Sequence, residues 1–180
     1  MAEHGIRDFL VAKRKAAERF GVTDGAVLPK NTEIEMALVE YQRLFGRDTH
    51  TESLHAQRSA ALQAMRQLSG FAPRLVGSVL SGTATQHSEV QLHLFAERPE
   101  AVTIWLMDQG IRHEVTARRV KMNAARVLEY PGVRFAVDDQ AIEATVFPTD
   151  GIRQAPVSPV DGKPMRRADA ADVEALLAGG

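Results

Sequence analysis

Residues 75–95 read LVGSVLSGTATQHSEVQLHLF and contain the clearest change of pattern in the chain. Two apolar residues lead into Gly77 and Ser78, and a polar loop follows. From Glu89 onward, polar and apolar residues alternate as far as Leu94. Such alternation is typical of a strand that buries one face. The segment therefore predicts a short strand over residues 74–78, a glycine–serine turn and a second strand over residues 88–95.

The second predicted strand separates two kinds of side chain. Successive side chains of a strand point to opposite faces, so the apolar residues face the core and the polar ones share the other face. A later strand over residues 141–147 repeats the pattern and carries Glu143 on its polar face. If the two strands are neighbours, Glu89, Gln91 and Glu143 converge on one face, beside the turn at Gly77 and Ser78.

These residue types suit chemistry on phosphate groups. A glycine lets a phosphate approach the backbone closely, and a serine hydroxyl adds a donor to the backbone N–H groups. Carboxylates on the opposite side can hold a divalent cation that bridges phosphate oxygens. The alternative is that Glu89, Gln91 and His93 form only the solvent-facing side of a half-exposed sheet, which is a common role for such residues.

The composition is that of an ordinary globular chain and argues against several classes of function. The 180 residues are 44% hydrophobic and 25% charged, with a formal net charge of −1, so no overall basic field indicates a nucleic-acid or membrane-surface protein. The absence of cysteine excludes disulfides, zinc–thiolate sites and cysteine nucleophiles. The first residues do not form a secretory signal, and no segment approaches the ~18 apolar residues of a transmembrane helix. We therefore expect a cytoplasmic protein without membrane contact, of open oligomeric state.

Helical periodicity dominates the first seventy residues and gives way to strand periodicity after Gly70. Three helices are expected, with apolar stripes over residues 6–20, 34–45 and 54–68. The second and third stripes predict an antiparallel helix pair. The whole pattern predicts an α+β fold, in which an N-terminal helical segment (residues 1–70) precedes a mixed β-sheet core (residues 71–180) with an inserted helix and a C-terminal strap and helix.

The later strands of this core are expected to be antiparallel. Pro131 and Gly132 fit the centre of a type II turn between residues 127–130 and 133–137. The residues from Asp138 to Gln140 then turn the chain into the strand that carries Glu143.

In these motifs the chain resembles the DNA polymerase beta-type nucleotidyltransferase superfamily. That family has a hydrophobic residue and Gly-Ser, then an Asp-hydrophobic-Asp strand, and a third acidic residue on a later strand. The resemblance implies a nucleotidyltransferase-like core and a nucleoside triphosphate substrate, with Gly77, Ser78 and Ser88 binding the nucleotide. It also implies catalysis with Mg²⁺ or Mn²⁺ held by Glu89, Gln91 and Glu143. The whole chain is similar to uncharacterised bacterial proteins assigned to this superfamily.

Two residues depart from the family pattern. Glu89 stands where the family has Asp, and its longer arm suits the octahedral geometry of Mg²⁺ poorly. Gln91 replaces a carboxylate, and at an effective dielectric of ~20 the lost charge is worth roughly 4 kcal/mol at 4 Å. The sequence therefore leaves two functions open. One is transfer of a nucleoside monophosphate from a triphosphate, and the other is a catalytically degenerate module that binds a nucleotide or a protein.

Other charged residues are further candidates for contact with phosphates or nucleic acid. The cluster nearest the predicted strands is the better candidate: Arg112, Arg118, Arg119, Lys121 and Arg126. The cluster on the first helix is typical of a solvated helix face: Lys13, Arg14, Lys15 and Arg19. Arg166 and Arg167 lie on the strap. His87 and His93 could transfer protons or contact phosphates, although a lone histidine is usually structural or solvated.

Overall fold

The strand periodicity after Gly70 becomes a mixed sheet in the computed structural model, which describes residues 9–20, 28–45 and 47–179. Within these residues the sheet has five strands in the order β1-β2-β5-β4-β3. β2 and β5 are parallel, and the other neighbours are antiparallel. The strands are β1 (Arg74–Val76), β2 (Val90–Phe95), β3 (His113–Lys121), β4 (Val127–Val137) and β5 (Gln140–Phe147). The expected α+β class is confirmed.

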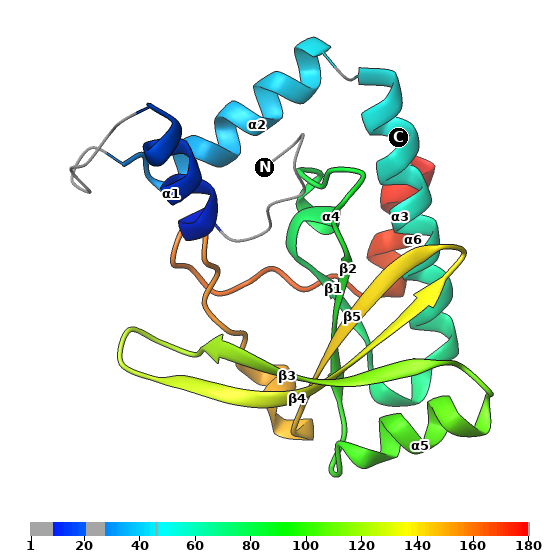
Figure 1. Cartoon of the computed structure of the whole chain (residues 1–180). Coiled ribbons are helices and arrows are strands. Elements are labelled where there is room, and N and C mark those ends of the chain that lie inside the picture. Colours follow the sequence, from blue (N-terminus) through cyan, green and yellow to red (C-terminus); the bar gives the residue numbers. More distant parts are fainter. Residues whose placement is uncertain (1–8, 21–27, 46, 180) are drawn as a thin grey trace.

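Helices surround this sheet (Figure 1). They are α1 (Phe9–Phe20), α2 (Asn31–Phe45), α3 (Arg47–Gln67), α4 (Gly77–Ser81), α5 (Glu100–Asp108) and α6 (Ala170–Ala178), with 3₁₀ turns η2 (Ser69–Phe71) and η3 (Thr149–Arg153). The first eight residues lie outside the described part of the chain, so the beginning of the first predicted stripe, at Ile6, does too. None of the described helices is long and apolar enough to cross a membrane.

The core lies between one face of the sheet and the helices α3 and α6. The apolar residues of β2 and β5 that alternation assigned to this face are fully buried, among them Leu92 and Ile142. From α3, Met65 and Leu68 are buried against them. Figure 1 shows α3 and α6 side by side on this side of the molecule. Burying each such side chain contributes roughly 1.5–3 kcal/mol, so this layer anchors the sheet.

The expected antiparallel pair of the second and third helices is wrong. The buried stripe of α3 packs on β2, β4, β5 and α6, while α2 runs away from α3 at a wide angle (Figure 1). The sheet offers α3 a broader apolar surface than α2 does, because several α2 residues such as Met36 and Val39 remain exposed.

The predicted turn at Pro131 and Gly132 is also wrong. Both residues lie inside β4, where they pair with Ala117 and Thr116 of β3, and the chain reverses earlier, between Lys121 and Val127. Because β4 pairs with β5 only from Gly132 onward, the proline lies where the strand has a ladder on one side only. A residue without an N–H is tolerated there.

Two other turns bound the strands of the site. Asp138 and Asp139 both have positive φ, 46° and 64°, and they form the tight connection between β4 and β5 that was predicted. The first strand, expected to reach Ser78, ends at Val76 instead. Gly77 has φ +74° and begins α4, so the glycine directly follows the strand.

The C-terminal strap crosses the second face of the sheet. It runs from η3 to α6 and is tied to both sheet edges by backbone hydrogen bonds. Ala168 bridges to Leu75 of β1, and the N–H of Val157 donates to the carbonyl of Lys121 of β3. This face therefore is partly covered, and it is the face that carries the polar residues singled out in the sequence.

Candidate functional site

The three residues expected to converge do lie on one face of neighbouring strands. In the register of the sheet, Gln91 of β2 faces Glu143 of β5, and Glu143 in turn faces Arg134 of β4. Glu89 precedes Gln91 by two residues and shares its face. The sheet thus brings the two carboxylates and the amide together, with an arginine that the sequence had not singled out.

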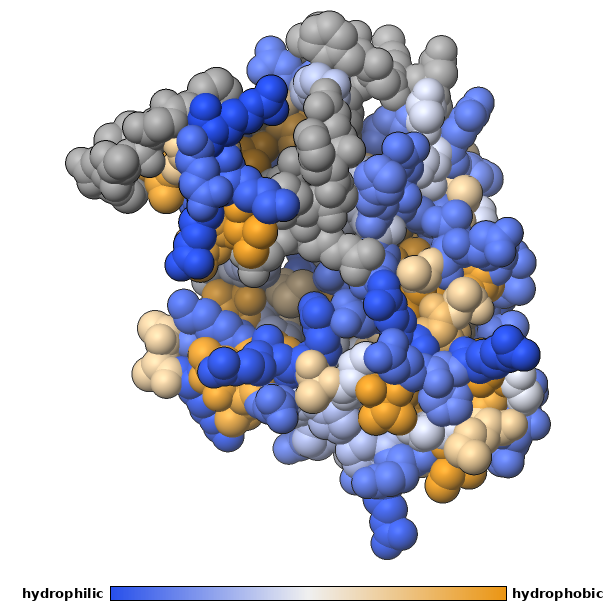
Figure 2. All heavy atoms as spheres, viewed as in Figure 1, coloured by the Kyte–Doolittle hydropathy of each residue, from blue (hydrophilic) through white to orange (hydrophobic). Residues whose placement is uncertain are grey.

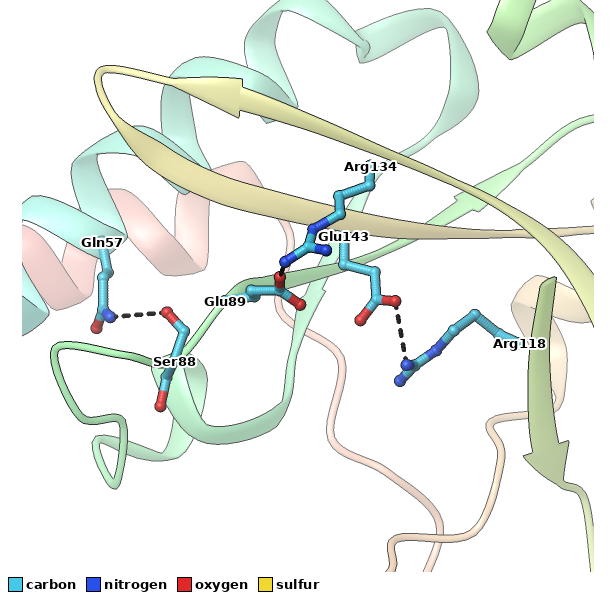
Figure 3. A network of polar contacts seen from close by, with 6 residues as sticks. All are labelled: Gln57, Ser88, Glu89, Arg118, Arg134 and Glu143. Atoms are coloured by element: carbon cyan, nitrogen blue, oxygen red, sulfur yellow. Dashed lines mark hydrogen bonds and ion pairs between the residues drawn. The ribbon is translucent and has the colours of Figure 1, made fainter. Parts of the chain in front are cut away.

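Each of the two carboxylates is held by an arginine. Arg134 donates to Oε1 of Glu89, and Nη1 of Arg118 lies 3.1 Å from Oε1 of Glu143. Figure 3 shows both arginines reaching these carboxylates from β4 and β3. The carboxylate side chains are only 5% and 13% exposed, whereas the arginine side chains are 44% and 42% exposed. The carboxylates are therefore buried beneath guanidinium groups that still reach solvent.

Gly132 explains how Arg118 reaches across the sheet. Arg118 and Glu143 lie on strands that are separated by β4, and Gly132 is the β4 residue that pairs with Thr116, two residues before Arg118. A Cβ at residue 132 would lie 2.8 Å from Oγ1 of Thr116, 2.9 Å from the carbonyl oxygen of Ala144 and 3.5 Å from Cγ of Arg118. Because the glycine leaves this space open, the arginine can cross β4. The residue predicted to form a turn instead permits an ion pair.

The Gly77–Ser78 pair is adjacent to Gln91. A Cβ at Gly77 would lie 2.5 Å from Oε1 of Gln91, and the positive φ of Gly77 is a conformation that other residues rarely adopt. The glycine therefore serves both the sharp entry into α4 and the close approach of the amide. These requirements exist without any ligand.

Five of the six predicted site residues line one cavity of about 590 Å³: Gly77, Ser78, Ser88, Glu89 and Gln91. Its other walls come from α2, from the loop after α4 and from the strap. The sixth residue, Glu143, is beside Gln91 in the sheet but does not line the cavity. The volume lies within the range of about 300–1,000 Å³ that is usual for small-molecule sites.

The cavity is rich in hydroxyl groups and has an apolar side. Its hydroxyls include those of Ser78, Ser88 and Ser158, and apolar surface comes from Leu80 and Met165. Charged groups also line it: Glu35, Glu89, Asp161 and Arg166. A lining of this kind can bind a ligand that combines a flat apolar part with several hydrogen-bonding groups.

Gln57 of α3 supports the turn that leads into the site, and the sequence had not singled it out. It is fully buried, and its Nε2 donates to the carbonyls of Thr85 and Ser88 at 2.8 and 3.0 Å (Figure 3). Its Oε1 has no hydrogen-bond partner among the described residues. Gln57 therefore positions Ser88, and through it Glu89. Its place on the buried stripe, four residues before Ala61, could have revealed it.

His93 lies on the same face but is part of the packing under the strap. It is 5% exposed, and its Nδ1 accepts a hydrogen bond from Nε of Arg167 at 3.1 Å. Its ring packs edge-on against Phe147 at 4.7 Å. Burial, together with the charges of Arg167 and Arg118, lowers the pKa of His93 to about 3. His93 is therefore neutral near pH 7. The other histidine singled out in the sequence, His87, lines the cavity.

The donor set does not fit the divalent cation that the resemblance implies. Each carboxylate already has a cationic partner, and Gln91 supplies only a neutral oxygen. Within the described residues no group of three or more acidic or histidine side chains could hold a metal ion. Magnesium sites rely on carboxylates whose charge is available to the ion.

The predicted basic clusters are divided by the structure. Arg118 joins the site and Arg166 lines the cavity, but Arg112, Arg119, Lys121 and Arg126 are exposed on and beside the β3–β4 hairpin. On the face drawn in Figure 2, the coloured surface is mostly hydrophilic and its apolar patches are separate. Exposed apolar residues on α5 and the hairpin, such as Met107 and Val115, are scattered in a way that is normal for protein surfaces.

No known protein family and no curated protein matches the chain.

Proposed function

We propose that this protein is a catalytically degenerate, nucleotidyltransferase-like module that binds a nucleotide in the cavity between α2, α4 and the strap. The observation that carries the proposal is the pairing of both carboxylates with arginines. Glu89 and Glu143 are the residues that metal-dependent transfer would need, and Arg134 and Arg118 neutralise them. Binding needs no free carboxylate pair, whereas two-metal or one-metal transfer does.

The cavity supports a nucleotide as the ligand. Its volume of about 590 Å³ suits a small molecule. The apolar side near Leu80 and Met165 can contact a base, while the hydroxyl groups and Gln91 can bond to sugar or base heteroatoms. The turn at Gly77 and Ser78 lies at the same cavity, as the resemblance implies for a phosphate-binding turn.

Equilibrium dialysis with labelled nucleotides and nucleosides tests this proposal. In dialysis, we expect the wild-type protein to bind nucleotides. In a separate transfer assay with Mg²⁺ or with Mn²⁺, we expect no label to be incorporated into an acceptor. Ser81→Trp places a bulky ring at an exposed residue of the cavity wall and should weaken binding by about tenfold or more. Ser69→Trp on η2 makes the same change at an exposed residue outside the cavity and should have no effect.

Two results would contradict the proposal. Nucleotidyl transfer by the wild type that Glu89→Ala abolishes would show an active transferase. Nucleotide binding that Ser81→Trp leaves unchanged would place the ligand elsewhere on the protein.

A further inference from the structure

The charges around the cavity restrict which nucleotide it can bind. Three carboxylates and one guanidinium line it: Glu35, Glu89, Asp161 and Arg166. A phosphate group is repelled by carboxylates whose charge is not offset, because like charges at short distance repel strongly in a partly buried site. A phosphate can therefore approach Glu89 only where another positive charge offsets the carboxylate.

Arg134 supplies that charge beside the cavity. It donates to Oε1 of Glu89, which lines the cavity, while its own side chain is 44% exposed. A guanidinium carries five N–H donors, and one carboxylate cannot use them all. The same group can therefore bridge a carboxylate and a phosphate oxygen, as a divalent cation does in a metal site.

Arg118 forms a second unit of the same kind. It holds Glu143 at 3.1 Å and is 42% exposed, and Glu143 is the register partner of the cavity residue Gln91. Two half-exposed guanidinium groups, each anchored to a buried carboxylate, thus lie on the polar face of the sheet. Neither arginine lines the cavity itself, but Glu89 does, and Glu143 is the neighbour of its lining residue Gln91. Anchoring reduces the rotamer entropy that these side chains would otherwise lose on binding.

We infer that Arg134 and Arg118 replace the divalent cation, so that the site binds a nucleoside monophosphate without metal. The inference rests on the proposed function and specifies its ligand. The two guanidinium charges are already balanced by Glu89 and Glu143. A monophosphate dianion adds less uncompensated charge than a metal-free triphosphate, which adds about twice as much. The geometry therefore favours one phosphate group with its base in the cavity.

The test measures binding of labelled nucleoside monophosphates and triphosphates, in EDTA and with Mn²⁺. Arg134→Gln and Arg118→Gln should each weaken monophosphate binding by about ten- to a hundredfold, the usual worth of a charge-assisted hydrogen bond. Arg134→Lys keeps the charge without the bidentate fork and should lie between wild type and Arg134→Gln. Arg66→Gln removes an exposed arginine–glutamate pair between α3 and α6, across the sheet from the site, and should bind as wild type.

The possible outcomes separate this inference from the proposed function. Monophosphate binding in EDTA that depends on both arginines supports it, provided that thermal unfolding shows each variant folded. Arg118→Gln and Arg134→Lys decide the matter if Arg134→Gln does not fold. Binding that requires Mn²⁺, favours the triphosphate or survives both glutamine substitutions overturns the inference and leaves nucleotide binding intact. No binding of any nucleotide refutes the proposed function itself.

Discussion

His93 should make the stability of the fold depend on pH above the range where carboxyl groups titrate. Its folded-state pKa is lowered to about 3 from the ordinary value of 6.5, first by burial and then by Arg167 and Arg118. Between these two values the unfolded chain binds a proton that the folded chain does not. Stability contributed by the neutral ring is therefore fully present above pH 6.5 and is lost as the pH falls toward 3.

The size of the effect follows from the two pKa values. On going from pH 7.5 to pH 5, the free energy of unfolding should fall by about 2 kcal/mol from this group alone. His93→Gln removes the titration and keeps an oxygen that can accept from Nε of Arg167. Urea unfolding gives the free energy of unfolding of wild type and variant at each pH. The difference between these two free energies should change by about 2 kcal/mol between pH 7.5 and pH 5.

A matched control and a direct measurement complete the test. His55→Gln makes the same substitution at an exposed histidine of α3 and is the matched control for the change of side chain. If His93→Gln does not fold, the ring resonances of His93 can be followed by NMR in the wild type and should not titrate between pH 7.5 and pH 5. The burial argument would be refuted by a His93 ring that titrates near pH 6. It would also be refuted if the free energies of unfolding of wild type and His93→Gln differed by the same amount at every pH.

Three further substitutions test the architecture of the site and the core. Gly132→Ala places a methyl group against a backbone carbonyl and should lower the free energy of unfolding by about 1–3 kcal/mol, measured in urea. Gln57→Leu removes both hydrogen bonds to the turn before β2; it should cost about 1–3 kcal/mol and speed hydrogen exchange there. Leu62→Ala removes a buried residue of α3 and should cost about 2–5 kcal/mol, while the exposed Val39→Ala should change thermal stability little.

The sheet face of the site could be predicted because alternation has a strict period. Once β2 and β5 are neighbours, Glu89, Gln91 and Glu143 must share a face. The buried face of α3 could be predicted in the same way, from the helical period of its apolar residues. Periodicity does not reveal which element packs against α3, because an apolar stripe on a helix can pack on a sheet as well as on another helix.

The arginines were missed for a different physical reason. Arg134 alternates with buried Val133 and Phe135, so it looks like any polar residue on an outward strand face. The turn predicted at Pro131 and Gly132 divided β4 into two strands. That prediction concealed the ion pair between Arg118 of β3 and Glu143 of β5, which crosses β4 near Gly132. Ion pairs that span three strands depend on sheet order, and a single sequence does not supply that order.

The contacts of the glycine–serine motif make it weaker evidence for phosphate binding than it is in the sequence alone. In sequence terms, Gly77 indicated a phosphate approaching the backbone. In the structure its positive φ and the amide of Gln91 require a glycine whether or not a phosphate binds. A substitution there would damage the fold and reveal nothing about the ligand. Arg134 and Arg118 are half-exposed and cap carboxylates that a metal site would keep free. Evidence for phosphate binding therefore has to come from the arginines, because their substitution changes the charge that a phosphate would meet while Gly77 keeps the entry to α4 intact.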